Sequence, residues 1–136
     1  MIVIPTSERL TMVNNMTAAT GSLNGVKVML YQNDLTPSAD SVLTDFVPCD
    51  FAGAVASAPV VWGPAFLNAL KQAVTVSTST VTFRPTDSLK PQNAQGYFVT
   101  DGAGAKLIYA EKFDSPVALN TVNDACVLVP TFAFGG

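Results

Sequence analysis

Short strand-like runs, separated by turn residues, occupy most of this chain, and no regular alternation of strand-like and helix-like segments accompanies them. Parallel strands need helix-length crossovers, so about seven or eight such runs without them favour antiparallel pairing. A length of 136 residues is enough to bury the core of one domain. We therefore predict a mainly β fold, an antiparallel β-sandwich of jelly-roll type with one short N-terminal helix.

The helix is predicted at residues 6–19. Thr6, or the serine after it, can cap the first turn, and apolar residues follow at helical spacing. Two glycines then break the chain before a strand at residues 26–31. This break divides the chain into an N-terminal segment, residues 1–24, and the β-sandwich domain, residues 25–136.

A long ordered loop is predicted at residues 33–50, which are rich in turn residues. One helical turn is expected within it, at residues 41–46. Beyond the loop, residues 54–62 and 72–77 have the composition of strands. Residues 65–70 fit either a strand or a helical turn, because so short an apolar run does not distinguish the two.

The clearest strand pairing is a hairpin in the second half of the chain. Its arms are residues 96–100 and 106–113, and the loop between them contains two glycines that allow the positive φ angles of hairpin closure. Residues 114–116 are predicted to end the second arm. A last strand follows at residues 125–134, and Pro130 inside it indicates a sheet edge or a bend.

Charged residues are scarce and scattered. They make up 12% of the chain, against roughly a quarter in ordinary soluble domains. Either part of the exterior is covered in an oligomer or larger assembly, or Ser, Thr, Asn and Gln supply the solubility. The seven basic residues are scattered and form no run of Lys or Arg. Because phosphate binding needs clustered positive charge, nucleic acid is a poor candidate partner. No apolar run is long enough for a membrane span and no secretory signal is evident, so cytoplasmic synthesis is expected.

The chain contains no histidine, and this removes the commonest general base, the usual catalytic triads and most zinc sites. We predict that it is not an enzyme and that it has no catalytic, cofactor-binding or metal-binding residues. The carboxylates that were weighed for acid–base chemistry or calcium binding are better explained as turn residues, because none has the spacing of a calcium loop. These are Asp34, Asp40, Asp45, Asp50, Asp101 and Asp124.

Other candidate groups have structural explanations. Gly102 and Gly104 resemble a phosphate loop only superficially, because no helix and no lysine-serine pair follow them. Cys49 lacks an activating base, and we expect it and Cys126 to be reduced and buried. Four aromatic residues could form a sugar-binding platform, but their strand-like neighbours favour core packing. They are Tyr31, Trp62, Tyr97 and Tyr109.

Several stretches resemble small structural proteins of tailed bacteriophages, and the likeness covers most of residues 26–134. It is carried by VMLYQNDLTP (residues 28–37) with SVLTDF (41–46), and by GYFVTD (96–101), AEKFD (110–114) and VPTF (129–132). The resemblance implies a capsid decoration or cement protein with a jelly-roll sandwich. It also implies homotrimers on the capsid surface, in the virion, after assembly in the host cytoplasm, that bind between subunits of the major capsid protein.

Two regions are expected to contact such a partner, residues 1–24 and residues 33–50, by means of exposed apolar loop residues and strand edges. Residues 1–24 could instead simply cover the end of the sandwich. The alternative function is a receptor- or carbohydrate-binding module of a phage tail or fibre. A carboxylate-type enzyme is a third and weaker possibility.

Overall fold

The structure is a computed structural model that describes residues 4–134. These residues form eight strands, one α-helix and a single 3-10 turn. The strands build three small antiparallel sheets, so the predicted mainly β, antiparallel class with one short N-terminal helix is confirmed. In this part of the chain no helix has the length and apolar character needed to cross a membrane.

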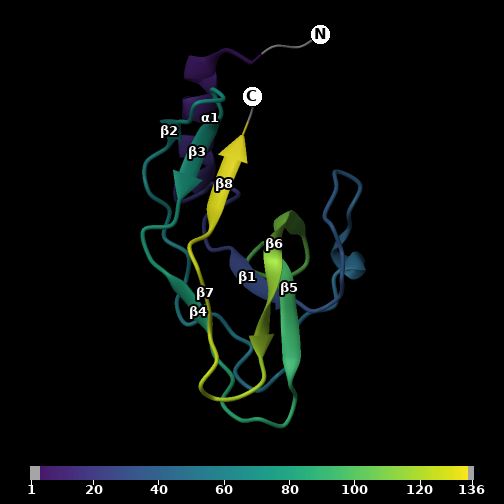
Figure 1. Ribbon diagram of the computed structural model, residues 1–136. Coiled ribbons are helices and arrows are strands. Elements are labelled where there is room, and N and C mark those ends of the chain that lie inside the picture. Colours follow the sequence, from purple (N-terminus) through teal and green to yellow (C-terminus); the bar gives the residue numbers. More distant parts are fainter. Residues whose placement is uncertain (1–3, 135–136) are drawn as a thin grey trace.

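The three sheets lie at two levels of the molecule (Figure 1). The largest has the order β1-β5-β6, with β1 at Lys27–Tyr31, β5 at Gln92–Thr100 and β6 at Leu107–Leu119. The second has the order β2-β3-β8, with β2 at Phe66–Leu67, β3 at Ala73–Val76 and β8 at Thr131–Phe134. The third pairs β4, Val81–Phe83, with β7, Cys126–Leu128. The helix α1 lies with the second sheet at one end of the molecule.

The helix α1 spans Thr6–Thr17 and packs on β3. Val13 is fully buried, Arg9 donates to the Lys71 carbonyl at 2.7 Å, and Ala65 N donates to the Asn14 side chain at 3.2 Å. The helix thus packs against the β2-β3-β8 sheet. Residues 1–3 of the N-terminal segment lie outside the described part.

The ends of α1 differ from the prediction. No side chain caps its first turn, and the Pro5 carbonyl accepts hydrogen bonds from Glu8 N at 3.0 Å and Arg9 N at 3.1 Å. The helix ends at Thr17 rather than residue 19, because Ala18 is extended. Gly21 then lies directly against the Met16 carbonyl, where a Cβ atom would overlap it.

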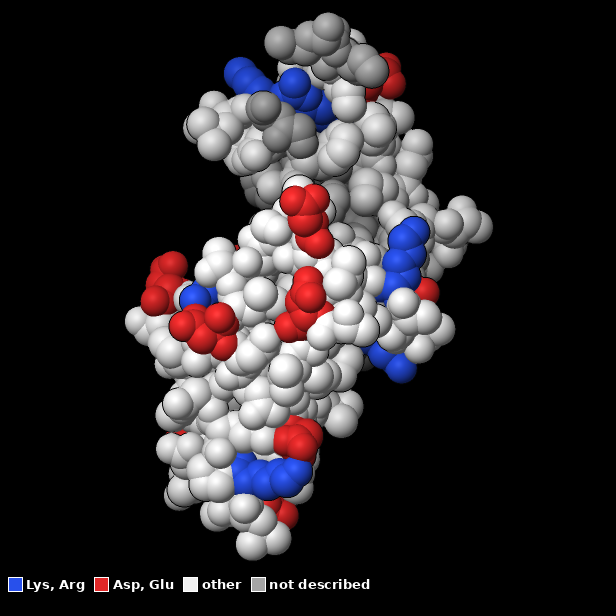
Figure 2. All heavy atoms as spheres, turned by 90° about the vertical axis from the view of Figure 1, so that its right-hand side faces the viewer, with Lys and Arg blue, Asp and Glu red and all other residues white. Residues whose placement is uncertain are grey.

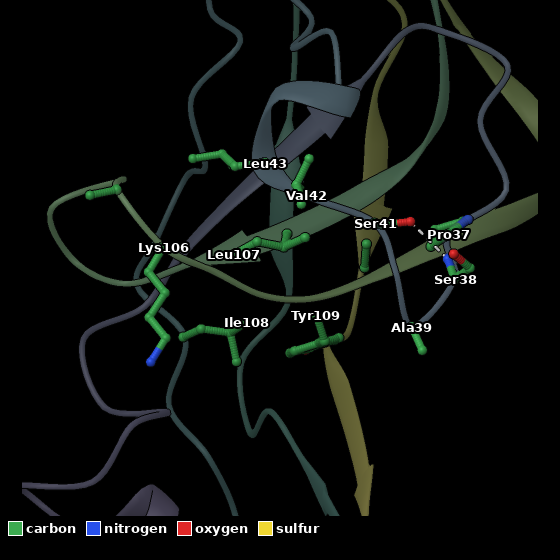
Figure 3. A pocket seen from close by; sticks show the side chains of 12 residues that line it. Pro37, Ser38, Ala39, Ser41, Val42, Leu43, Lys106, Leu107, Ile108 and Tyr109 are labelled. Atoms are coloured by element: carbon green, nitrogen blue, oxygen red, sulfur yellow. Dashed lines mark hydrogen bonds between the residues drawn. The ribbon is translucent and has the colours of Figure 1, made fainter.

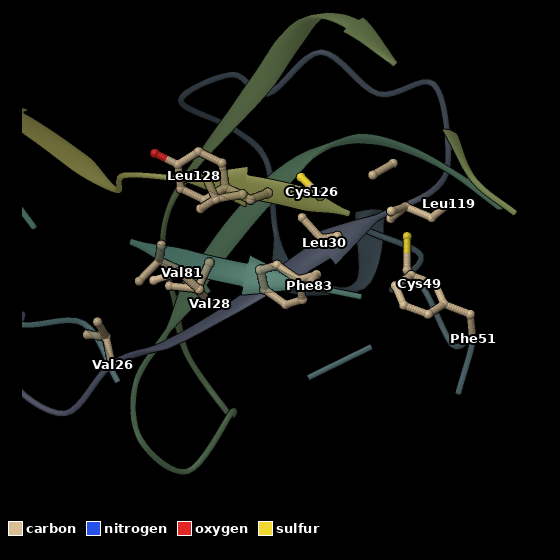
Figure 4. Close-up of a cluster of buried hydrophobic side chains, with 13 residues drawn as sticks. Val26, Val28, Leu30, Cys49, Phe51, Val81, Phe83, Leu119, Cys126 and Leu128 are labelled. Atoms are coloured by element: carbon tan, nitrogen blue, oxygen red, sulfur yellow. The ribbon is translucent and has the colours of Figure 1, made fainter. Parts of the chain in front are cut away.

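The main hydrophobic core lies between the β1-β5-β6 sheet and the β4-β7 pair (Figure 4). Alternate residues of each strand point into it, as expected for strands with one buried face. Phe83 is fully buried at its centre, next to the two cysteines in the same cluster. The other buried members are Val26, Val28, Leu30, Phe51, Val81, Ala94, Tyr97, Val99, Leu119 and Leu128.

The prediction of a strand at residues 54–62 is wrong. This segment makes turns and touches neighbouring strands only at isolated points, such as the bridge between Trp62 and Ser77 and the bond from Ser57 N to the Thr82 carbonyl at 3.0 Å. Its alanines bury little surface, and Pro59 has no amide to donate to a ladder. The ambiguous residues 65–70 contain the two-residue strand β2.

The hairpin prediction is confirmed, but its second arm is longer than expected. β6 does not end at residues 114–116 and continues to Leu119. The register moves from Gly96↔Lys112 to Ala94↔Val117, so one residue of β5 faces four of β6 in a wide bulge that contains Pro116. Among the described strands β6 pairs only with β5, and an edge strand tolerates a proline.

Residues 125–134, which were predicted as one strand, form the two strands β7 and β8. Pro130 separates β7 from β8, and the two belong to different sheets. The bend that this proline predicts is therefore confirmed, and it lets one apolar run contribute to both levels of the molecule.

Candidate interaction surfaces

The loop at residues 33–50 folds back over the outer face of the β1-β5-β6 sheet. Phe46 is only 4% exposed and packs against Tyr31 and Phe98, with ring centroids 5.0 and 5.1 Å away. Leu35 and Leu43 pack on the same cluster. The predicted helical turn is confirmed as a 3-10 turn, Leu43–Asp45. Three apolar side chains of this loop, those of Leu35, Leu43 and Phe46, thus belong to a second small core.

Polar contacts fix the loop on the sheet. The Tyr31 hydroxyl donates to the Leu35 carbonyl at 2.9 Å, and Lys112 of β6 forms an ion pair with Asp34. Inside the loop, the Asn33 amide donates to the Asp45 carbonyl at 2.8 Å and accepts from Val47 N at 2.9 Å. These bonds order a segment that has almost no regular secondary structure.

A first cavity of about 770 Å³ lies between the loop and the start of β6 (Figure 3). Aliphatic side chains of Val42, Leu43, Leu107 and Ile108 line much of it, with Lys106 at one side. Neither a carboxylate nor a thiol is among the side chains that line it. Ser38, Ser41 and Tyr109 also line the cavity, so its surface combines apolar and polar groups.

A second hollow, of about 470 Å³, runs along the free side of β1, and we call it the β1 groove. One wall is the strand from Val26 to Met29, and the other is the segment 54–60. Lys27 is the only charged residue in the lining, which otherwise consists of valine, alanine, methionine, proline and one serine. The sequence prediction missed this groove, because it interpreted residues 54–62 as a strand.

The backbone of β1 is unpaired on the side of the β1 groove. Cys49 N donates to the Leu30 carbonyl and Gln32 N to the Val47 carbonyl, both at 2.9 Å, so the even residues of β1 direct their backbone groups away from β5. Val28 has the same parity, and its N–H and C=O therefore point toward the groove. Within residues 4–134 neither the N–H nor the C=O of Val28 has a hydrogen-bond partner.

The loop carboxylates act in turns and ion pairs. Asp45, Asp101 and Asp124 accept backbone amides of their own turns. Asp34 pairs with Lys112, and Asp50 pairs with Lys90 at 2.6 Å. Throughout the described residues, no three Asp, Glu or Cys side chains converge as metal ligands would.

Hydrogen bonds shift the acidity of three of these groups. Contacts from Lys90 and Gln92 lower the pKa of Asp50 below its ordinary value. Backbone amides of Ala105 and Lys106 lower the pKa of Asp101, and those of Asn120 and Thr121 lower the pKa of Asp124. Such bonds stabilise the ionised carboxylates, which is what a turn cap requires.

We expect these caps to weaken in acid. Because the folded pKa of Asp124 is lowered, its contribution to stability is present above the ordinary value of 3.8 and is lost as the pH falls through the folded pKa. The urea midpoint should therefore fall with acidification, and less steeply in Asp124→Asn than in the wild type. Asp40→Asn is the control, because the Asp40 carboxylate accepts no hydrogen bond from the described residues. Equal acid sensitivity of all three proteins would contradict the assignment.

The aromatic residues do not form an exposed sugar platform. Tyr31 and Tyr97 are buried, and the Tyr97 hydroxyl donates to Glu111 at 3.0 Å. The Tyr109 ring packs edge-on against Tyr97 at 6.0 Å, and the half-buried Trp62 donates its indole N–H to the Leu23 carbonyl at 2.8 Å. Burial also raises the pKa of Tyr97 and Tyr109. Core packing, the structural explanation weighed for these residues, is confirmed.

Both cysteines are free and buried, as predicted. Burial raises the pKa of the Cys49 thiol to about 12, with smaller contributions from Cys126 and Asp50, and raises that of Cys126 to about 11. We therefore expect neither thiol to react with Ellman's reagent in the native protein near neutral pH, and both to react after unfolding in guanidinium chloride. Rapid native labelling of either cysteine would show that the core opens there.

The outer surface combines isolated charges with exposed apolar side chains. On the face shown in Figure 2, Lys and Arg form no continuous patch. Val55, Leu70 and Leu89 are at least 72% exposed. Gly102 and Gly104 lie in the turn of the β5–β6 hairpin, not in a phosphate loop before a helix.

Comparison with protein-family models, with curated proteins and with solved structures found no match to this chain.

Proposed function

We propose that this chain is a virion structural protein, a decoration or cement protein that binds between major capsid subunits and stabilises a phage capsid. In this proposal the sheets form a β-sandwich of jelly-roll type, and three copies associate on the capsid surface. The resemblance of residues 26–134 to phage structural proteins supports this assignment.

The observation that carries the proposal is the β1 groove. Its lining is apolar apart from Lys27 and one serine, which suits the docking of an apolar protein segment. The low charge of the surface and the exposed valine and leucine side chains also favour burial in an assembly. Of the side chains weighed for chemistry, Asp45, Asp101 and Asp124 accept amides of their own turns, Asp34 and Asp50 form ion pairs, and both cysteines are buried.

Co-sedimentation tests the proposal directly. Empty shells assembled from the major capsid protein encoded in the same genome are mixed with the purified chain and pelleted. We expect saturable binding, and a capsid that resists heat better when decorated. Light scattering should give a mass three times the 14.2 kDa of one chain.

The alternative function predicts a different result. A receptor- or carbohydrate-binding module of a tail or fibre would ignore empty capsids and be retained on a glycan column. That outcome would overturn the cement proposal. The burial of Tyr31 and Tyr97 weighs against it, since these rings are not available to stack on a sugar.

A further inference from the structure

The connection between α1 and β1 contains the dipeptide Asn24-Gly25, and both of its residues are exposed. Glycine has no Cβ, so its amide nitrogen is open to approach by the preceding side chain. Gly25 has a φ of 71°, and no atom lies within 4 Å of the position that a Cβ would occupy. Among the described residues, no acceptor binds the Gly25 N–H. This nitrogen is therefore free to lose its proton to solvent and to react.

Asn24 differs from the other asparagines in this respect. It is the one asparagine of the chain that a glycine follows. Asn14 and Asn15 lie in α1, where the amides that follow them donate to helix carbonyls. The Asn33 side chain is held at both ends, since its nitrogen donates to one backbone carbonyl and its oxygen accepts from one backbone amide. Asn24 combines a free neighbouring amide with an exposed side chain.

We propose that Asn24 is a site of spontaneous deamidation, in which water converts its side-chain amide to a carboxylate through a cyclic imide. The Gly25 nitrogen gives its proton to hydroxide and attacks Cγ of Asn24. The N–Cγ bond forms, the Cγ–Nδ2 bond breaks, and ammonia leaves with a proton from water. The attack is intramolecular, and this proximity replaces a catalyst. The reaction needs no partner and is independent of the proposed capsid binding.

Water then opens the ring at one of its two carbonyl carbons. Opening at Cγ of Asn24 breaks the new bond and gives aspartate. Opening at the main-chain carbon breaks the original peptide bond and gives isoaspartate, in which the chain runs through Cβ and Cγ. The backbone of the isoaspartate form is therefore longer by one atom.

One contact opposes the reaction. The Asn24 side-chain amide donates to the Ala19 carbonyl at 2.7 Å and so holds the group that must leave. The bond is exposed, and a single neutral hydrogen bond slows the attack by no more than about tenfold. The product carboxylate has no proton to donate, so its contact with the Ala19 carbonyl becomes repulsive.

The structural consequence falls on the buried residues on either side. Leu23 is fully buried, its amide donates to the Met16 carbonyl at 2.9 Å, and its carbonyl accepts from the Trp62 indole at 2.8 Å. Val26 is also buried, at 7% exposure. The extra backbone atom of isoaspartate enters this short connection, so we expect Leu23 to move away from the Trp62 indole.

Peptide mapping tests the site. The folded chain is incubated at mildly alkaline pH, digested with trypsin and compared by tandem mass spectrometry with a sample that was not incubated. Residues 10–27 form one tryptic peptide that contains Asn14, Asn15 and Asn24. We expect conversion at Asn24 ahead of the other two, faster at higher pH, and within about tenfold of the rate in guanidinium chloride. Conversion that occurs only in the unfolded chain, or equally at the three asparagines, would overturn the proposal.

Variants at the two exposed positions separate the chemistry from its consequence. Asn24→Gln keeps the amide but must close a larger ring, so it should not convert over the same period. Gly25→Ala shields the nitrogen and should slow conversion by roughly tenfold. Circular dichroism checks that both are folded. Undiminished conversion in Gly25→Ala would overturn attack by that nitrogen.

Fluorescence reports the movement of Leu23, because Trp62 is the single tryptophan of the chain. The emission of the wild type should shift during the incubation, and that of Asn24→Gln should not. Asn24→Asp carries the product charge without the longer backbone, so its emission distinguishes the two causes of a shift. A wild type that converts to isoaspartate with unchanged emission would refute the predicted movement of Leu23.

Discussion

Replacing Phe46 with alanine is expected to lower the free energy of unfolding by about 3 to 5 kcal/mol, the range for a large buried aromatic side chain. Phe46 is 4% exposed and is the part of the loop 33–50 that enters the second core. Its ring contacts Tyr31 edge-on and stacks on Phe98, and such aromatic pairs add about 0.5 to 1.5 kcal/mol beyond burial. Urea unfolding followed by fluorescence or circular dichroism measures the change.

Val42→Ala in the same loop is the matched control. Val42 is 54% exposed, so its truncation should change stability by less than about 0.5 kcal/mol. If the two variants were equally stable, the loop would not be anchored by its aromatic residue, and the interpretation of residues 33–50 as a cover of the sheet would be wrong. If Phe46→Ala is folded but weakened, the loop should also exchange amide protons faster than the sheet below it.

The elements that the sequence predicts correctly are those with local signals. The β5–β6 hairpin is set by glycines in its loop and by arms that adjoin each other in sequence. The turn caps are also local, since Asp45, Asp101 and Asp124 accept amides no more than five residues away. Burial of Cys126 follows from its place in an apolar strand run. In each case the deciding interaction is visible within a short window of sequence.

The errors concern pairing between distant residues. Residues 54–62 have strand composition, but no neighbouring edge accepts them as a ladder, and they form the wall of the β1 groove instead. The composition of residues 114–116 indicates the end of a strand. β6 nevertheless continues through them, because a bulge accommodates Pro116 at the edge of the sheet. The ion pairs of Asp34 and Asp50 join residues 78 and 40 positions apart. Composition cannot show which distant segments meet.

The β1 groove could not be predicted from the sequence for the same reason. Nothing in residues 26–31 distinguishes an open strand edge from a paired one, because pairing depends on where residues 47–60 go. Pairing with residues 47–49 stops after Leu30, and the chain then turns at Gly53, whose φ of 94° suits glycine. The Phe51 side chain enters the core at this point. The open edge is thus a consequence of that turn.

Gly96→Ala is the second change with a large expected effect, a loss of about 3 to 4 kcal/mol from steric overlap and a broken hydrogen bond. Gly96 pairs with Lys112 in the centre of the β1-β5-β6 sheet. A Cβ atom there would overlap the Glu111 carbonyl and come within 2.7 Å of two atoms of the Tyr31 ring and hydroxyl. The overlap with the Glu111 carbonyl strains the ladder between β5 and β6, and the overlap with Tyr31 forces that side chain to shift.

Displacement of Tyr31 gives this variant a recognisable signature. The Tyr31 hydroxyl anchors the loop through the Leu35 carbonyl, and its ring supports Phe46, so the loop should loosen together with the sheet. Gly104→Ala is the control, because Gly104 has a φ of 74° but no atom within 4 Å of the added Cβ, and it should cost only about 1 kcal/mol. Hydrogen exchange should show faster amides in residues 33–47 in Gly96→Ala and not in Gly104→Ala. Equal effects of the two substitutions would mean that backbone conformation, and not the contact with Tyr31, explains the glycine at position 96.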